Sequence, residues 1–424
     1  MTAMPVSVGI GEREITPRHP VPLAGFASRQ NKPYTDIDRS LWVRAWWIGT
    51  ERDFALLVVA DILWWAPERQ LGFRQRIADR WRVPVSRILL HATHTHSAPQ
   101  TSDVFTESVG SPSSEWVEMF EEASLRAIAD SHQSIAPSIL TLHKGSTDIG
   151  YNRRISRDDP DAVPEATGLV DDQLTVIRCT SPDGSPRGLL FHLACHPTIT
   201  DAPHVSSEYP GIACENLRGE FGMVSMLQGT CGDVNPRVTR NQTRRDVGDD
   251  VVAGVAAELV TDIRSTLSNE GVSIAIEEIR NAEVKVDCRS TSVASEEAIS
   301  NGIKHGGLRD EWARALRRYP HRNTPSQTMT LYRLDLGSDL QFVTFDAEVV
   351  TAYGLYAREI GQTSALPLGY TNGMVGYIVT DEQLANGGYE PDESTVYFAL
   401  PSPFAPGLEH SVRTGIHQLI SQGE

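Results

Sequence analysis

The stretch Ser86-Arg-Ile-Leu-Leu-His91-Ala-Thr-His94-Thr-His96-Ser97 joins a short apolar segment to a cluster of histidines. Residues 86–91 have the length and apolarity of a buried strand. The polar run 92–100 follows directly, so it lies at the carboxyl end of that strand, where open α/β sheets place their ligands. The stretch therefore predicts an α/β fold with a functional site beyond residue 91.

Two histidines of this stretch, His94 and His96, are separated by one residue. Side chains two residues apart on an extended segment point to the same side, so both imidazoles are expected to reach one site. Neutral imidazole is a common zinc ligand. The pair predicts either two metal ligands or one ligand beside an acid–base group. The alternative is a polar loop whose histidines bond to backbone groups.

The segments on both sides of this stretch alternate between strand and helix patterns. Strands are expected at residues 41–49, 54–60, 138–143, 174–180, 188–194, 224–229, 273–286, 328–336 and 340–345. Helices are expected at residues 67–83, 113–132, 246–267, 295–318, 349–361 and 408–420. Turns at 182–186 and 337–339 join neighbouring strands into hairpins. The pattern indicates a mixed α/β (α+β) chain in which mixed sheets are flanked by helices.

The chain shows no internal repeats, low-complexity tracts or Pro/Ser-rich linker that would divide it. A single domain covering residues 1–424 is therefore predicted. The charged stretch 289–323 has the weakest pattern and is interpreted as an insertion or a lid.

The composition of the 424 residues is that of a folded protein, with 40% hydrophobic and 22% charged residues. The 38 basic and 55 acidic residues give a net charge of −17, which repels a phosphate backbone. Nucleic acid is therefore excluded as a partner, and a small-molecule substrate is expected. A homo-oligomer is compatible with this composition.

Targeting signals are not evident in the sequence. Residues 1–13 lack the basic and apolar parts of a secretory signal, and the longest apolar run, 54–65, is too short to span a bilayer. The five cysteines lack CxxC spacing, which predicts free thiols in a reducing compartment. They are Cys179, Cys195, Cys214, Cys231 and Cys288. We therefore expect a cytoplasmic protein without a membrane anchor.

Two further segments carry polar residues after apolar strands. His196 precedes Pro197, which restricts the local backbone, and the glycine-punctuated loop 229–236 contains Asn235. Taken alone, His196 also fits an ordinary core histidine and the loop fits an ordinary tight turn. The sequence contains no GxSxG elbow, GxGxxG or P-loop motif, or HExxH helix, so these motifs indicate no serine-hydrolase, nucleotide or zincin site.

Taken in order, these segments resemble the catalytic domain of the neutral ceramidase family, the non-lysosomal N-acylsphingosine amidases. Residues 92–97 resemble the family's zinc-site motif THTHSGP, and residues 232–236 resemble its GDVSP loop. The other matching segments are 9–17, 23–26, 151–153, 196–197, 207–211, 347–348, 372–377 and 389–390. The matches run almost the length of the chain, and the resemblance implies a neutral ceramidase-like fold.

The resemblance also implies a site. The residues that it places around one zinc ion per chain are His94, His196, Glu348 and Tyr377. The residues that it places in catalytic positions are His96, Arg153, Tyr389 and, where the family has a serine, Asn235. No organic cofactor site is implied.

The implied reaction is the hydrolysis of an amide bond by a zinc-activated water, with His96 protonating the leaving amine. Asn235 departs from the family because an amide cannot act as a nucleophile. Asp346 and Ala347 stand where the family has proline and glycine, which puts the presentation of Glu348 in question. The chain ends at Glu424, which leaves no room for the family's C-terminal sandwich domain.

We therefore expect an amidase or deacylase that acts on a soluble N-acyl compound. Two alternatives stay open at this point. The same metal site would also serve the hydrolysis of an ester or lactone, or a lyase or isomerase reaction on a small carbonyl substrate. A non-catalytic carbohydrate- or metal-binding protein with the same fold is the third hypothesis.

Overall fold

Two β-sheets packed face to face form the centre of the fold. The structure is a computed structural model that describes residues 6–154, 168–240, 248–361 and 365–422. The larger sheet has the strand order β11 (Met223–Gln228), β9 (Pro186–Leu193), β8 (Gln173–Thr180), β6 (Ala136–Ser146), β1 (Val6–Glu14), β3 (Trp42–Gly49), β4 (Phe54–Ala60) and β5 (Ile88–Ala92), and β13 (Val272–Ser273) also pairs with β6. The smaller sheet has the order β14 (Ile279–Arg289), β15 (Ser326–Leu336), β16 (Leu340–Phe345) and β18 (Ala365–Leu368).

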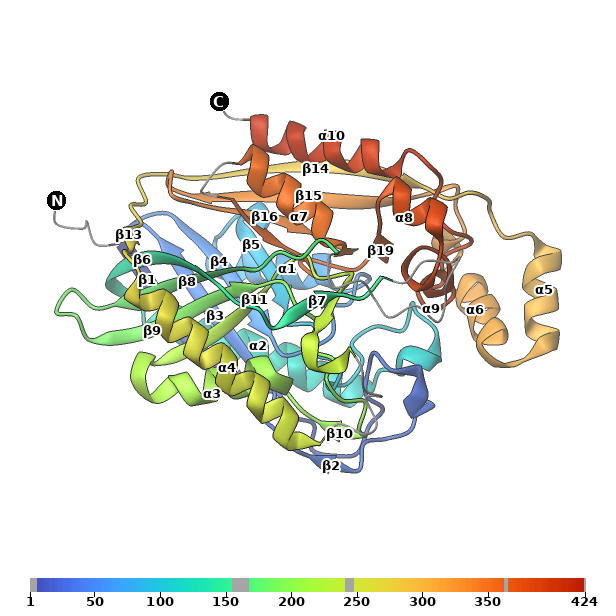
Figure 1. Cartoon of the computed structure of the whole chain (residues 1–424), viewed down its shortest axis with the longest axis horizontal. Helices are drawn as coiled ribbons and strands as arrows, with labels where there is room; N and C mark the ends of the chain where they lie inside the picture. Colours follow the sequence, from blue (N-terminus) through green and yellow to red (C-terminus); the bar gives the residue numbers. More distant parts are fainter. Residues whose placement is uncertain (1–5, 155–167, 241–247, 362–364, 423–424) are drawn as a thin grey trace.

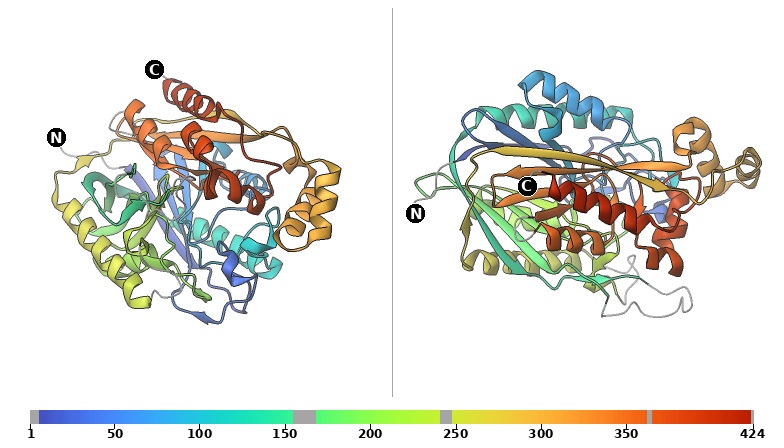
Figure 2. Two further views of the ribbon diagram at one scale, coloured as in Figure 1. Left: turned by 45° about the vertical axis from the view of Figure 1, so that its right-hand side comes forward. Right: turned by 90° about the horizontal axis from the view of Figure 1, so that it is seen from above.

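Helices cover the outer face of each sheet, so the layers follow the order helix, sheet, sheet, helix (Figures 1 and 2). The helices on the larger sheet are α2 (Ser114–Gln133), α3 (Glu208–Phe221) and α4 (Asp249–Ser268), and α1 (Gln70–Trp81) lies beside β5. The helices on the smaller sheet are α7 (Thr351–Ile360) and α10 (Leu408–Ser421). Both sheets contain parallel and antiparallel pairs, which confirms the predicted α/β class with mixed sheets flanked by helices.

Strand β4 illustrates how the sequence produces this layering. Leu56 and Val58 point into the core on the helix-covered side of the larger sheet, whereas Leu57 and Val59 point into the core between the two sheets. Successive side chains of a strand point to opposite faces, so a strand covered on both faces must be apolar throughout. The uninterrupted apolar run at residues 54–60 has this physical cause.

Short elements complete the fold around one end of the sheets. Three two-stranded pairs connect distant segments: β2 (Asp36–Ile37) with β10 (His204–Val205), β7 (Gly150–Asn152) with β12 (Val234–Pro236), and β17 (Glu348–Val349) with β19 (Tyr377–Ile378). The chain then forms α8 (Asp381–Asn386), a π-helix (Tyr389–Glu393) and α9 (Ser394–Tyr397).

The structure differs from the sequence-based expectation in a few elements. The segment 295–318 forms two helices, α5 (Glu296–His305) and α6 (Gly307–Arg318), because Gly306 and Gly307 both have positive φ values of 71° and 63°. Strand β1 and helix α3 were not predicted. Figure 1 shows α5 and α6 at one end of the molecule, and their role as an insertion or lid stays a prediction.

Two further sequence-based expectations concern free thiols and membrane-spanning segments. All five cysteines are free and buried. Within the described ranges, every helix is too short or too polar to cross a membrane.

Candidate metal centre

The loops that follow β5 and β9 bring His94 and His196 together, with their ring centroids 5.0 Å apart. These strands lie near opposite ends of the strand order in the larger sheet. The sheet curls so that its two ends meet here, where the backbone N–H of Gln228 on β11 donates to Nε2 of His91 on β5 at 2.8 Å. The site is therefore formed where the two ends of one sheet approach each other.

The side chain of Gln228 connects the two histidine loops. Its Nε2 donates to the carbonyl oxygens of Thr93 at 3.3 Å and Cys195 at 3.0 Å, and its Oε1 accepts from the Cys195 N–H at 3.3 Å. Thr93 and Cys195 directly precede His94 and His196, so Gln228 sets the spacing of the two imidazoles. No sequence motif pointed to Gln228, whose only local signal is its position at the end of a predicted strand.

Glu348 faces both histidines from the smaller sheet's side of the site. Its Oε1 lies 2.8 Å from Nε2 of His196 and 3.3 Å from Nε2 of His94, and all three side chains are buried. Strand β17 pairs in parallel with β19, which places Tyr377 directly opposite Glu348. Asp346 and Ala347, which stand where the matching family motif has proline and glycine, thus still present Glu348 to the histidines.

The hydrogen bonds of the two imidazoles indicate which nitrogens face the centre with a lone pair. Nδ1 of His94 lies 2.8 Å from the carbonyl oxygen of Leu63, and Nδ1 of His196 lies 3.0 Å from that of Val234. A carbonyl oxygen only accepts, so each Nδ1 carries a hydrogen, and a ring without a second hydrogen directs the lone pair of Nε2 at the carboxylate. Burial, together with the charge of Arg153, lowers the pKa of His196 to about 4, which disfavours an imidazolium at neutral pH.

These acceptor atoms therefore fit a cation. Two imidazole lone pairs and a carboxylate oxygen at these distances repel one another unless a positive charge lies between them. An imidazole whose second nitrogen donates to a carbonyl is the usual arrangement of a metal ligand. The chemistry of the donor set matches that of a zinc site.

His96 lies at the edge of this group. Its Nε2 is 3.2 Å from Nε2 of His94, and one nitrogen from each of His94, His96 and His196 lies within 4.8 Å of the others. The expected extended geometry is wrong, because His94 has a positive φ of 65° and follows the end of β5. The two rings meet through a turn. Arg29 holds this turn by donating to the carbonyl oxygen of His96.

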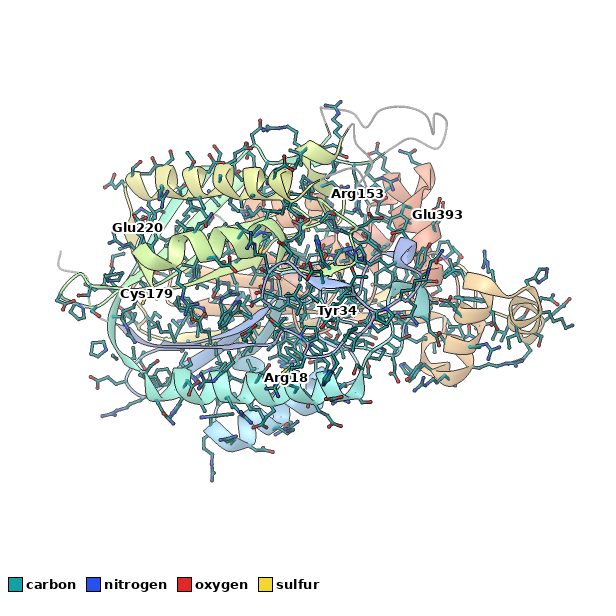
Figure 3. The ribbon with its side chains drawn as sticks, turned by 90° about the horizontal axis from the view of Figure 1, so that it is seen from below. Arg18, Tyr34, Arg153, Cys179, Glu220 and Glu393 are labelled. Atoms are coloured by element: carbon teal, nitrogen blue, oxygen red, sulfur yellow. The ribbon has the colours of Figure 1, made fainter. Side chains whose placement is uncertain are left out.

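Arg153, directly after β7, connects several of the predicted site residues. Its nitrogens donate to the hydroxyl of Tyr377 at 2.8 Å, to Oδ1 of Asn235 at 3.0 Å, to the carbonyl oxygen of Gly232 at 2.9 Å and to Oε1 of Glu390 at 3.0 Å. Figure 3 shows Arg153 at the same end of the molecule as Glu393, away from Cys179 and Glu220.

Two residues complete the site from the π-helix. The ring of Tyr389 lies 5.8 Å from that of Tyr377 and 5.9 Å from the guanidinium carbon of Arg153, and 41% of Tyr389 is exposed. Glu390 is buried and forms an ion pair with Arg153 through Oε1 and with Arg154 through Oε2. The structure thus brings all eight predicted site residues to one region. It adds Glu390, which the sequence analysis matched only as part of a motif.

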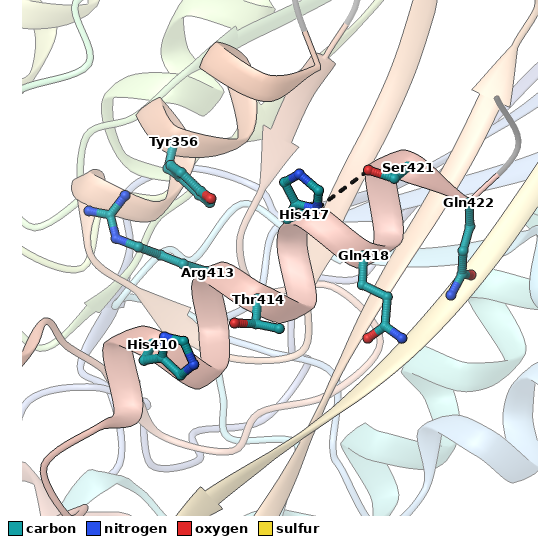
Figure 4. A pocket seen from close by; sticks show the side chains of 8 residues that line it. All are labelled: Tyr356, His410, Arg413, Thr414, His417, Gln418, Ser421 and Gln422. Atoms are coloured by element: carbon teal, nitrogen blue, oxygen red, sulfur yellow. Dashed lines mark hydrogen bonds between the residues drawn. The ribbon is translucent and has the colours of Figure 1, made fainter.

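A separate surface cavity of about 820 Å³ lies along α10, away from these residues (Figure 4). Its lining residues are Tyr356, His410, Arg413, Thr414, His417, Gln418, Ser421 and Gln422. Arg413 already pairs with Glu409 at 2.8 Å and lies 4.5 Å from the centroid of the Tyr356 ring. None of the predicted site residues contributes to this cavity.

The comparisons with known proteins agree with the fold described above. No protein-family model matches the sequence, and no curated protein matches it. Among solved structures, neutral ceramidase from Pseudomonas aeruginosa superposes with a TM-score of 0.78 at 16% sequence identity, over 98% of this chain and 74% of that chain. A ceramidase complexed with C2 superposes with a TM-score of 0.77 at 17% identity, over 98% of this chain and 75% of that chain. The chain has a neutral ceramidase-like fold, as its motifs predicted.

Proposed function

We propose that this chain is a zinc-dependent hydrolase that cleaves the amide bond of an N-acyl compound. The observation that carries the proposal is the convergence of Nε2 of His94, Nε2 of His196 and Oε1 of Glu348 on one buried point. Histidine nitrogens with a carboxylate oxygen are a typical ligand set of catalytic zinc. The likeness of the fold to two ceramidases supports an amide as the scissile bond.

Tyr377 is the fourth ligand that we assign. It lies opposite Glu348 in the paired strands, and its hydroxyl oxygen accepts from Arg153, a group that only donates. Burial raises the pKa of the Tyr377 phenol well above its usual value, and the positive charge of Arg153 acts in the opposite direction. A cation beside the phenol acts in the same direction as Arg153 and favours the phenolate.

Zinc bound at such a site would supply a Lewis acid for the carbonyl oxygen and would lower the pKa of a bound water to about 7. The remaining chemistry belongs to the side chains around it. The carbonyl carbon gains a hydroxyl oxygen, the C–N bond breaks, and the leaving nitrogen takes a proton. The products are a carboxylate and an amine.

His96 is the residue that we assign to this proton transfer, at Nε2. Its ring lies beside those of His94 and His196 and is only partly buried, so a substrate can reach it. Imidazole is the side chain that most often transfers a proton to or from a reacting group in enzymes.

Arg153 and Asn235 have a different role from His96 in this proposal. Every nitrogen of Arg153 already donates to a protein acceptor, so Arg153 holds Tyr377 and Asn235 in place. Asn235 has no nucleophilic oxygen and accepts from Arg153 through Oδ1. Tyr389, which is partly exposed beside Tyr377, is the donor that we assign to the developing charge on the carbonyl oxygen.

The experiment that tests the metal is elemental analysis of protein purified without added metal. Wild type, His94→Ala and His410→Ala are compared, the last being a matched control because His410 is an exposed histidine on α10. We expect about one zinc per chain in wild type and control, and its loss in His94→Ala. Equal zinc in all three proteins, or none in wild type, would overturn the proposal.

Substrate class is tested on the zinc-loaded protein with N-acyl amides and the corresponding esters and lactones. Hydrolysis of the amides supports the proposal. Turnover of esters or lactones alone, or an elimination product, would replace the amide with another carbonyl substrate. No turnover of any compound would favour a binding protein. The variants Asn235→Ala and Asn235→Ser belong in the same assay, because full turnover by Asn235→Ala would exclude a role for that side chain.

A further inference from the structure

Tyr370 lies against a proposed metal ligand and belongs to none of the motifs that led to the site. Its ring stacks on that of His94, with centroids 3.8 Å apart and ring planes inclined by 22°. Tyr370 is fully buried and has a positive φ of 52°, a region that aromatic residues seldom occupy. Backbone hydrogen bonds to Ala92 and Ala347 hold it there. Such a conformation persists only where the surroundings impose it.

The hydroxyl of Tyr370 lies between a thiol and the carboxylate of Glu348. It is 3.1 Å from Sγ of Cys231 and 3.5 Å from Oε1 of Glu348, the second being a long contact. An ionised carboxylate only accepts, so the phenol donates its single hydrogen to Glu348. The thiol of Cys231 then donates to the phenol oxygen. The hydrogen bonds run in one direction, from Cys231 through Tyr370 to Glu348.

Cys231 is itself held in a rigid position. It is fully buried in the loop between β11 and β12, and its carbonyl oxygen accepts from the Val234 N–H at 2.9 Å. The next residue, Gly232, donates to the carbonyl oxygen of Val349 at 2.9 Å, which ties this loop to the strand that carries Glu348.

We propose that Cys231 and Tyr370 form a positioning pair that holds Glu348 and His94 in the geometry required for metal binding. The inference rests on the proposed function, because it requires a metal at this site. The ring of Tyr370 restricts rotation of the His94 imidazole, and its hydroxyl orients Oε1 of Glu348. Groups that orient metal ligands in this way commonly change metal affinity by 10–100-fold when they are removed.

The test measures zinc affinity of the metal-free protein by competition with a chromophoric chelator. Tyr370→Phe keeps the stacked ring and removes the hydroxyl, and we expect it to weaken zinc binding by roughly 10-fold. Cys231→Ala is expected to weaken binding less, and Cys231→Ser, which restores a donor, is expected to recover most of that loss. Tyr353→Phe is the matched control, because it removes a buried hydroxyl that donates to the carbonyl oxygen of Val379.

A second measurement separates positioning from general stability. The absorption spectrum of bound cobalt(II) reports ligand geometry, so it is expected to change in Tyr370→Phe and to stay unchanged in Tyr353→Phe. Because Cys231 acts through Tyr370, the double variant is expected to bind zinc no more weakly than Tyr370→Phe alone.

The outcomes distinguish this inference from the proposed function. If wild type binds zinc and both Tyr370→Phe and Cys231→Ala keep wild-type affinity and cobalt spectra, the positioning pair is wrong while the metal site stands. If wild type binds no zinc, the proposed function and the pair are both wrong. An equal loss of affinity in Tyr353→Phe would show a structural effect and would also overturn the pair.

Discussion

Nε2 of His196 lies 2.8 Å from Oε1 of Glu348, although 152 residues separate the two in the chain. Nδ1 of His196 already donates to a backbone carbonyl, so the short contact joins two acceptors. Two acceptors this close to each other are stable only with a cation between them.

Glu348→Gln is expected to lose zinc binding without destabilising the metal-free protein. The substitution removes the negatively charged metal ligand. The NH₂ group of the glutamine can donate a hydrogen bond to an imidazole lone pair, whereas the carboxylate repels that lone pair. Thermal unfolding with and without zinc measures both effects. We expect the zinc-induced rise in Tm to disappear, while Tm of the metal-free variant equals or exceeds that of wild type.

Glu311→Gln provides the control for this experiment. Glu311 accepts from the backbone and hydroxyl of Ser108, away from the site, so its zinc-induced rise in Tm should match wild type. A large drop in Tm of metal-free Glu348→Gln would contradict the interpretation that the site holds opposed acceptors.

His96→Ala separates two assignments of the third histidine. We expect the variant to keep its zinc and to lose turnover by about 10²–10⁴-fold, because the proton donor is removed and the ligands stay. Elemental analysis and steady-state kinetics on the same preparation measure both quantities. Loss of zinc would instead make His94, His96 and His196 the ligand set, a group whose nitrogens already lie within 4.8 Å.

Gly25→Ala is expected to displace the His96 ring. A Cβ at residue 25 would lie 2.4 Å from Nδ1 of His96, and Gly25 has a positive φ of 97°. We expect turnover to fall at least about tenfold. Gly184→Ala is the matched control, since Gly184 has a φ of 88° and open space around it. Both variants carry backbone strain of about 1–3 kcal/mol, so a difference between them reports the contact with His96. Wild-type turnover in Gly25→Ala would show that turnover does not depend on the position of the His96 ring.

The pH dependence of stability is expected to reflect His91, which is buried and accepts from the Gln228 N–H. Burial lowers its pKa from 6.5 to about 3, so the folded state binds fewer protons than the unfolded state between these values. The stabilisation is therefore complete above pH 6.5 and is lost as the pH falls toward 3, by at most about 1.4 kcal/mol per pH unit. Burial also lowers the pKa of His192, which acts with the same sign.

Urea unfolding of the metal-free protein at pH 7, 6 and 5 measures this slope. His91→Gln is expected to flatten it by up to about 1.4 kcal/mol per pH unit, the contribution of one proton. His410→Gln, on the exposed surface of α10, is expected to leave it unchanged. Equal slopes in His91→Gln and wild type would show that His91 does not set the acid sensitivity.

Local pattern was sufficient for several features of this protein. The apolar run of β4 predicted a strand buried on both faces, because the alternation of side chains is a property of the strand itself. The motif order predicted the neutral ceramidase-like fold, and it selected His94, His196 and Glu348 as residues that belong to one site. The strand inference succeeds because it depends on neighbours in the sequence, whereas the fold and the shared site were implied by the resemblance of the ordered motifs to a known family.

The same patterns misjudged how the residues meet. The spacing of His94 and His96 suggested an extended segment, whereas the left-handed backbone of His94 turns the chain there. Helix 295–318 was predicted as one element because Gly306 and Gly307 are only moderately unfavourable in a helix, and their positive φ values become evident in the structure.

By itself, the sequence determined most strands of the two large sheets, most of the longer helices and the identities of the chemically active side chains, whereas strand β1 and helix α3 were not evident in it. Only the tertiary structure decided the contacts between them: the link that Gln228 makes between two loops, the approach of Glu348 to His196, and the position of Tyr370 between Cys231 and Glu348. Periodicity records the environment of a residue along its own element. Contacts between segments that are distant in the sequence depend on how the sheets curl and pack. The local sequence pattern contains no information about that packing.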